Sequence, residues 1–321
     1  MNEKRSNAND DMPMIVGIGG LDHAQPKPQP VADRIAFRVA GTCFGIFGGD
    51  DTPLTLDAEL RDFAADAGEC DVRIDARWAD QIARPAGEAT FDSGGLWTVF
   101  HEGANSEFYF ATPYLGSAPY KALTIDREFR RGELLLSRAC LDASRAMYPL
   151  EYPLDELLMI HRLGRGEGVE MHAMGLVDEA GRGHLFLGHS GAGKSTTARL
   201  WQRESRALIL SDDRIILCER DGRIWMHGTP WHGDAGIASP KSAPLYRAYL
   251  IEHGSKTQLA GVSKGRAAAE FLARSFVPHY SADAMAFTLE FLDRVAQQTP
   301  CFAFKFLPDQ SAVEAICRAS D

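Results

Sequence analysis

The chain has 321 residues, of which 45% are apolar and 24% are charged, the balance of a soluble globular protein with room for one or two domains. Its formal net charge of -10 argues against nucleic acid or an anionic membrane as the main partner, because phosphate groups are bound by basic faces. No apolar run approaches the roughly 20 residues that span a bilayer, and the polar N-terminus does not resemble a signal peptide. We therefore expect a cytoplasmic protein.

Residues 1–30 have the composition of a disordered tail. Proline alternates with polar residues over residues 25–30, which favours an extended backbone. We expect folded structure to begin near residue 31.

Residues 31–150 are rich in alternating apolar and polar residues, the pattern of half-buried strands. The clearest predicted strands are residues 34–39, 71–75 and 106–110, and residues 96–101 and 122–125 are further short candidates. Residues 134–147 are typical of a strand followed by a helix. No combination of side chains here has catalytic chemistry, so we interpret this stretch as a β-rich α+β accessory domain that packs on the second half or selects its partners.

Residues 151–321 alternate strands and helices, as an α/β domain does. The predicted elements include a helix after Pro153, a strand at 169–177, and helices at 264–276 and 282–297. Asp221-Gly222 is the strongest hairpin signal in the chain. The glycine-rich segment 228–236 is too polar to be expected in the core.

One segment of this half, GHSGAGKS at residues 188–195, matches the phosphate-binding pattern G-x-x-x-x-G-K-[ST] in full. Glycines let the backbone turn so that its N–H groups point at phosphate oxygens. Lys194 then reaches the β- and γ-phosphates, and the Ser195 hydroxyl is placed to hold Mg²⁺. The sequence therefore predicts ATP and Mg²⁺ as cofactors. The predicted nucleotide contacts are Gly188, Ser190, Gly191, Ala192, Gly193, Lys194, Ser195 and Thr196.

The surroundings of this segment fit a P-loop, in which a strand leads into the glycines and a helix follows them. The apolar run 184–187 predicts the strand, and residues 194–203, which lack Gly and Pro, predict the helix. A second apolar strand, 207–210, leads into Asp212 and Asp213. P-loop folds place the carboxylate that handles Mg²⁺ at such a position.

Three segments, Met171-His172, 188–195 and 211–214, together resemble the catalytic domain of HPr kinase/phosphorylase, a bacterial protein-serine kinase. That family shares its nucleotide core with ATP-dependent phosphoenolpyruvate carboxykinase, and the resemblance covers roughly residues 150–321. It is closer still to HPr-kinase-related proteins found beside bacterial peptide-maturation genes. The resemblance implies an α/β P-loop catalytic domain of HPr kinase/phosphoenolpyruvate carboxykinase type at 151–321, preceded by the β-rich domain at 31–150. The basic, glycine-containing segment of HPr kinases is not recognisable here, which argues against HPr as the substrate.

The same resemblance implies roles for the acidic pair. Asp212 would be the base that takes the proton from the acceptor hydroxyl, with His172 beside its carboxylate. Asp213 and Ser195 would hold Mg²⁺, and Lys194 would act on the transferred phosphate. Because adjacent strand residues point to opposite faces, one metal-facing and one acceptor-facing carboxylate is a reasonable division.

Two other residues receive weaker expectations. Asp234, in its glycine-rich segment, is a candidate for contact with metal or acceptor. His184 is expected at the surface or in a hairpin.

Three functions fit these features. The first is a kinase that transfers the γ-phosphoryl group of ATP to a Ser or Thr hydroxyl of a peptide, protein or small molecule, with a peptide or protein such as a ribosomal precursor peptide favoured. The second is a lyase of the phosphoenolpyruvate carboxykinase type, although its oxaloacetate-binding motifs are not found. The third is a non-catalytic nucleotide-binding switch, against which the second carboxylate argues. The acceptor, a reverse phosphorylase reaction and homo-oligomer formation stay open.

Overall fold

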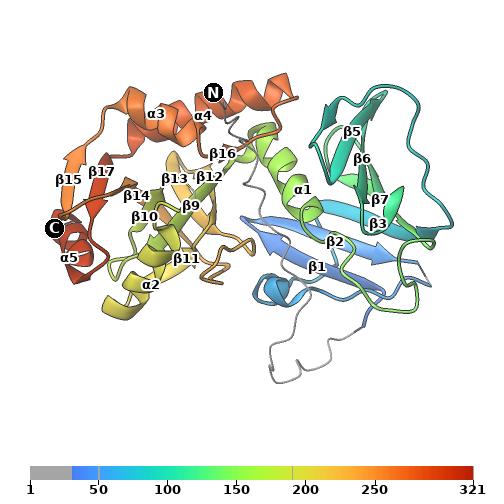
Figure 1. Ribbon diagram of the computed structural model, residues 1–321, viewed down its shortest axis with the longest axis horizontal. Coiled ribbons are helices and arrows are strands. Elements are labelled where there is room, and N and C mark those ends of the chain that lie inside the picture. The colour runs from blue at the N-terminus through green and yellow to red at the C-terminus, as the bar shows by residue number, and fades with distance from the viewer. Residues whose placement is uncertain (1–30, 50, 190, 321) are drawn as a thin grey trace, which may run out of the picture. The chain divides into compact units, whose positions relative to one another are not determined.

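Two large sheets build the fold, and each takes its strands from one continuous stretch of the chain (Figure 1). The structure is a computed structural model that describes residues 31–49, 51–189 and 191–320. These residues belong to one compact unit, and the predicted tail lies outside them. The protein is of the mixed α/β type.

The first sheet has eight strands in the order β1-β2-β3-β8-β7-β6-β5-β4. The strands are β1 (Arg34–Val39), β2 (Thr42–Gly48), β3 (Val72–Ala79), β4 (Phe91–Asp92), β5 (Trp97–Glu102), β6 (Asn105–Thr112), β7 (Gly116–Ile125) and β8 (Arg131–Ser137). Neighbouring strands are antiparallel except for β2–β3 and β3–β8, which are parallel and need longer connections. The 3₁₀ helix η1 (Ala58–Phe63) lies in the connection from β2 to β3.

The helix predicted within residues 134–147 does not form. β8 ends at Ser137, and residues 138–149 run through turns. Asp142 accepts hydrogen bonds from the Ser144 N–H (3.0 Å) and hydroxyl (2.6 Å). Such local side-chain bonds compete with the hydrogen bonds of a helix.

The second sheet has nine strands, and β9 is its hub. The strands are β9 (Val169–Val177), β10 (Gly183–Leu187), β11 (Leu208–Ser211), β12 (Arg214–Arg220), β13 (Arg223–Gly228), β14 (Ser242–His253), β15 (Gln258–Gly261), β16 (Ser275–Phe276) and β17 (Cys301–Phe306). The order is β10-β9-β12-β13-β14-β17-β15, while β11 and β16 also pair with β9. Because β10 pairs with β14 as well, the strands from β10 to β14 along this order close into a ring.

The predicted hairpin turn joins β12 to β13. Asp221 and Gly222 have φ angles of 52° and 70°, the left-handed pair that a tight two-residue hairpin requires.

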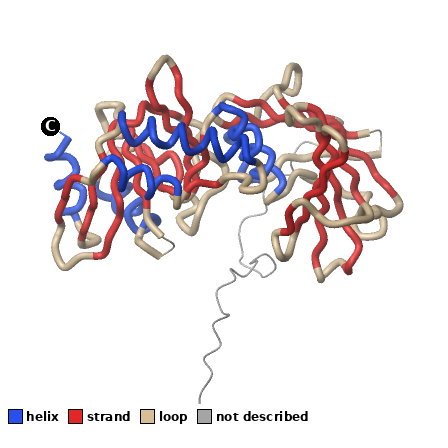
Figure 2. The backbone as a smooth tube through the Cα atoms, turned by 90° about the horizontal axis from the view of Figure 1, so that it is seen from above, coloured by secondary structure: helices blue, strands red, loops and turns tan. Residues whose placement is uncertain are grey.

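Helices cover both faces of the second sheet, and Figure 2 shows the α-helices gathered around it. The helices that pack in its two clusters are α2 (Lys194–Glu204), α3 (Lys264–Leu272), α4 (Ala282–Gln298) and α5 (Gln310–Ser320). Helix α1 (Leu154–Arg162, followed by a π turn at Leu163–Glu167) packs instead in the cluster of the first sheet. Alternate residues of β10 face opposite ways. Leu185 packs in the cluster that contains α3 and α4, and Phe186 packs in the cluster that contains α2 and α5. Within the described residues no helix is long and apolar enough to cross a membrane.

The helix predicted at 264–276 ends early, at Leu272. Ser275 and Phe276 instead pair with β9, and the Arg274 carbonyl accepts a hydrogen bond from the His172 N–H at 2.7 Å. Pairing with β9 thus overrides the local helical pattern.

The core of the first sheet continues into the second half of the chain. Its buried cluster includes Leu154 and Leu158 of α1, Ile216 of β12 and Trp231. Because one buried cluster joins residues from both sides of position 150, the domain boundary proposed there stays a prediction.

Candidate active site

The segment 188–193, called the glycine loop below, joins β10 to α2, and its shape depends on its glycines. Gly191 and Gly193 have φ angles of 76° and 103°, in the left-handed region that side chains disfavour. At Gly188 a Cβ atom would lie only 2.7 Å from the Ala192 Cβ. Strand, glycine loop and helix follow one another in the predicted order.

Lys194 begins α2 and turns back over the glycine loop. Its Nζ donates hydrogen bonds to the carbonyl oxygens of Gly188 (3.0 Å) and His189 (3.3 Å). Burial lowers the pKa of the Lys194 amine, and the nearby Asp213 carboxylate only partly offsets this. The amine is therefore held where an incoming anion could draw it away from carbonyl oxygens.

The other predicted nucleotide contacts differ in exposure. Ala192 is buried, Ser195 is half-buried, and Thr196 is exposed on the first turn of α2. Ser190 lies outside the described residues. The first turn of this helix presents free backbone N–H groups, which favour phosphate.

The two adjacent carboxylates lie where β11 gives way to β12, and both strands pair with β9. Asp212 is fully buried. Its Oδ1 accepts hydrogen bonds from the N–H groups of Gly233 (3.0 Å) and Ile237 (3.3 Å). Its Oδ2 accepts from the Ala235 N–H (2.9 Å) and the Ser195 hydroxyl (3.1 Å). Since a carboxylate has about four acceptor positions, Asp212 is saturated.

Asp213 is the accessible member of the pair, with 23% of its side chain exposed. Its Oδ1 lies 3.0 Å from His172 Nε2, and its Oδ2 accepts a hydrogen bond from the Arg214 guanidinium. Burial raises the pKa of Asp213, but the His172 hydrogen bond and the charges of Arg214 and Lys194 outweigh it, so the pKa lies below its usual value. Asp213 is therefore ionised at neutral pH.

His172 thus lies beside Asp213, whereas the sequence suggested Asp212. On β9, His172 stands directly opposite Arg214 of β12, so its ring reaches the carboxylate that precedes Arg214. Asp212 points the other way, toward Ser195, as neighbouring residues of a strand do. The register between β9 and β12 decides this pairing, and no short sequence pattern reports it.

Two arginines add positive charge, and the sequence indicates a role for neither. Arg214 donates to Glu156 (2.8 Å) as well as to Asp213. The buried Arg274 contacts His189 of the glycine loop, with 3.1 Å between Nη2 and Nε2. Because Arg274 stands in a stretch with helical periodicity, its place beside the glycine loop follows only from the pairing of β16 with β9.

The segment 228–236 is not wholly a surface loop, contrary to expectation. Thr229 is fully buried and donates its hydroxyl to the Arg214 carbonyl (2.9 Å), and Trp231 is 9% exposed. Asp234 is exposed, and it accepts a hydrogen bond from Arg199 through its main-chain oxygen (2.9 Å). The first half of the segment therefore packs inside, and only its glycine-rich second half meets solvent.

A pocket of about 310 Å³ opens beside Asp213 and is called the acceptor-side pocket below. Four stretches of chain line it: Asp57, Glu59 and Leu60; Tyr148, Tyr152 and Asp155; Asp213 and Arg214; and Pro230, Trp231 and His232. Asp213 thus both lines this pocket and is acted on by the charge of the Lys194 amine. An acceptor in the pocket could therefore reach Asp213.

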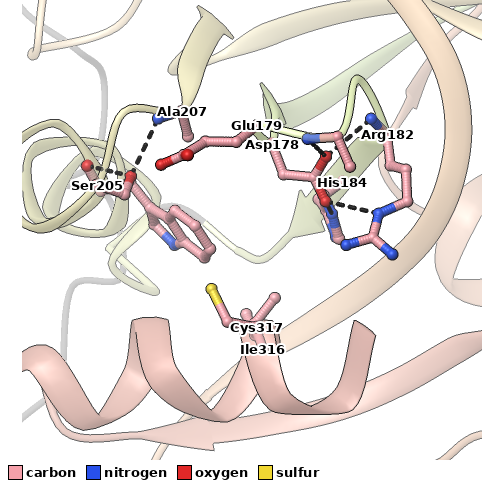
Figure 3. A pocket seen from close by; sticks show the side chains of 10 residues that line it. Asp178, Glu179, Arg182, His184, Ser205, Ala207, Ile316 and Cys317 are labelled. Atoms are coloured by element: carbon pink, nitrogen blue, oxygen red, sulfur yellow. Dashed lines mark hydrogen bonds and ion pairs between the residues drawn. The ribbon is translucent and has the colours of Figure 1, made fainter. Parts of the chain in front are cut away.

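A second pocket, of about 220 Å³, lies between the C-terminal end of α2 and α5 (Figure 3). His184 lines it but is 1% exposed, so the expected surface position is wrong, whereas its strand does form a hairpin with β9. Its ring lies between Asp178 (3.0 Å) and the Tyr249 hydroxyl (3.2 Å). The glycine loop is at the opposite end of α2, about 16 Å away at 1.5 Å per residue.

The oxygens near the glycine loop suit a cation that arrives with a triphosphate. Among the residues that the structure describes, no group of three or more His, Cys, Asp or Glu could hold a metal ion. Ser195 Oγ, whose hydrogen is directed at Asp212 Oδ2 3.1 Å away, has its lone pairs left for the cation. Mg²⁺ commonly takes one or two protein oxygens and completes its shell with phosphates and water.

Comparison with known proteins finds similarity to solved structures only, and it is distant. No protein-family model matches the chain, and no curated protein matches it. A solved structure of the Hpr(Ser) kinase/phosphatase from Coxiella burnetii is similar at 14% identity and a TM-score of 0.27, over 47% of this chain and 89% of that one. Similarity at this level supports no functional conclusion.

Proposed function

We propose that the chain is an ATP- and Mg²⁺-dependent kinase that transfers the γ-phosphoryl group to a Ser or Thr hydroxyl of a peptide or protein. The observation that carries the proposal is the opposite orientation of two adjacent carboxylates. Asp212 is turned to Ser195 at the glycine loop, and Asp213 is turned to His172 and the acceptor-side pocket. A protein that only bound nucleotide would need the first arrangement and not the second.

The nucleotide side is built for phosphate. The glycine loop and the first turn of α2 supply backbone N–H groups, and Lys194 exchanges its carbonyl partners for phosphate oxygens. By accepting the hydrogen of Ser195, Asp212 leaves the lone pairs of that hydroxyl free for a cation. When bound there, Mg²⁺ would neutralise charge on the β- and γ-phosphates.

The acceptor side supplies the base. As the acceptor oxygen bonds to the γ-phosphorus, the bond from that phosphorus to the β–γ bridging oxygen breaks and ADP departs. The proton of the acceptor hydroxyl passes to Asp213 and then to water. The lowered pKa makes Asp213 a weak base, and that suffices because phosphoryl transfer depends mainly on positioning and charge.

These roles exchange the two carboxylates relative to the sequence expectation, in which Asp212 was the base. The accessibility of the two side chains supports the exchange. Asp212 is fully buried with every acceptor position engaged, whereas Asp213 borders a pocket.

The matched variants Asp213→Asn and Asp212→Asn test the assignment. Loss of general-base assistance in Asp213→Asn should slow transfer by about 10²–10⁴-fold, with ATP affinity little changed. Asp212→Asn should weaken ATP binding in a Mg²⁺-dependent way, because Ser195 loses its orienting partner. The transfer rate is measured with labelled γ-phosphate and Ser peptides. The ATP affinity is measured by calorimetric titration across a Mg²⁺ series. If Mg²⁺ rescued Asp213→Asn and not Asp212→Asn, the original assignment would hold instead.

A further inference from the structure

The acceptor-side pocket carries more acidic groups than proton transfer requires, and we infer that it selects acceptors with a positive charge next to the hydroxyl. For a peptide, the phosphorylated Ser or Thr would adjoin Lys or Arg. This inference rests on the proposed function, because it names the substrate class of the same site.

The acidic groups at the rim come from the first half of the chain. Asp57 precedes η1 without capping it, and it makes no ion pair with any residue in the described part of the chain. Glu59, on η1, is 66% exposed at its side chain and lies 3.7 Å from His232 Nε2. Both carboxylates are therefore open to a ligand that enters from solvent.

Nearby basic groups do not cancel this charge. Three basic side chains in or beside the pocket each have an acidic partner: Arg214 pairs with Glu156, Lys121 with Glu151, and His232 with Glu59. Arg214 is held by Asp213 as well. Among the described residues Asp57 makes no ion pair, and the charges of Glu151 and Glu59 act on it more strongly than that of Lys121, so the balance of the pocket stays negative.

Aromatic walls fit the same kind of ligand. Tyr152 is 61% exposed beside the pocket, and Tyr148 and Trp231 line its buried part. Aromatic faces attract cations, and they also pack against the apolar stems of Lys and Arg. The Trp231 ring is nine-tenths buried, and its indole N–H is directed at the Asp155 carboxylate, so Trp231 offers the ligand its ring face.

The size of the pocket places the charge close to the reacting hydroxyl. A volume of about 310 Å³ is at the lower end for ligand sites and holds roughly one long side chain with adjoining backbone. Asp213 and the rim acids line this one small space. A hydroxyl at Asp213 and a cation at Asp57 or Glu59 must therefore belong to neighbouring residues.

The test uses the full chain with ATP, Mg²⁺ and a library of short peptides that each contain one Ser between randomised positions. Mass spectrometry of the phosphorylated peptides should show Lys or Arg enriched beside the Ser. With a matched pair of peptides, the variant Asp57→Asn/Glu59→Gln should lose up to about fivefold per contact in kcat/KM for the basic peptide. Glu59→Lys should shift the preference toward an acidic neighbour. Asp62→Asn, an exposed carboxylate change on η1 outside the pocket, is the control.

Each outcome separates the two proposals. Phosphorylated peptides without basic enrichment, or equal effects of the Asp57/Glu59 and Asp62 variants, overturn the inference and leave the kinase intact. Absence of phosphorylation across the library, with ATP still bound, overturns a peptide acceptor and with it both proposals.

Discussion

The two sheets approach the proposed reaction from different sides. Every side chain that we assign to phosphate, cation or proton lies between His172 and Arg214, in the nine-stranded sheet and its connections. The first half of the chain contributes to the same region through the segment around η1, as Asp57, Glu59 and Leu60, and through Tyr148. In our proposal the second half of the chain carries the chemistry and the first half adds the acidic charge that selects the acceptor, so we expect variants to change one without the other.

The largest effect, a loss of phosphoryl transfer without a loss of stability, is expected from Lys194→Ala. Losing this charge on the transferred phosphate should reduce transfer by at least about 10²-fold, by analogy with other groups that stabilise developing charge. The melting temperature should hold, because the amine bonds only carbonyls of the glycine loop. Lys256→Ala, an exposed surface change, is the control. Undiminished transfer by folded Lys194→Ala protein would remove the glycine loop from the mechanism.

A smaller effect, on stability, is expected where the two regions join. Asp155 belongs to α1, whose Leu154 and Leu158 pack in the core of the first sheet, and burial raises the pKa of Asp155 to about 7. The folded protein therefore holds a proton that the unfolded chain releases near pH 4. This contribution to stability is complete below about pH 4, decreases as the pH rises to about 7 and is then constant, a total of at most about 4 kcal/mol.

The substitution Asp155→Asn should weaken the dependence of folding stability on pH. Denaturant midpoints at pH 5 and pH 8 should differ less in the variant than in the parent chain, and the variant should be the more stable at pH 8. A residual slope of the same sign is expected from buried Glu170, whose pKa burial also raises. Asp62→Asn serves again as the matched control. An unchanged slope in Asp155→Asn would place the titrating group elsewhere.

The smallest effect is expected at the second pocket. Glu179 lines it and is exposed, at the end of α2 away from the glycine loop. Glu179→Gln should leave transfer and peptide preference within about twofold of the parent chain, as surface substitutions usually do. A larger change in steady-state kinetics would show that this pocket communicates with the site and that the division between regions is incomplete.

The sequence predicted features that depend on neighbouring residues and missed those that depend on contacts between distant residues. The strand, glycine loop and helix around Gly188 follow from adjacent residues, and so does the hairpin at Asp221-Gly222. The place of the acidic pair at the end of an apolar strand was likewise predictable.

Long-range register decided the rest. The partner of His172 depends on how β9 and β12 align, and Arg274 reaches the glycine loop because β16 joins the same strand. Asp57 and Glu59 meet Asp213 across more than 150 positions of sequence, a distance over which no local pattern operates.

The pairing of β9 has a mechanical consequence for the site. Because β11 and β12 both bond to β9, the two residues between them are clamped at each end, and only side-chain rotation can alter the spacing of their carboxyl groups. The wall of the acceptor-side pocket that Asp213 and Arg214 form is thus rigid. Adjustment to acceptors of different bulk is then expected from the other walls of the pocket, among them the stretch around η1, which forms no part of the second sheet in the described chain.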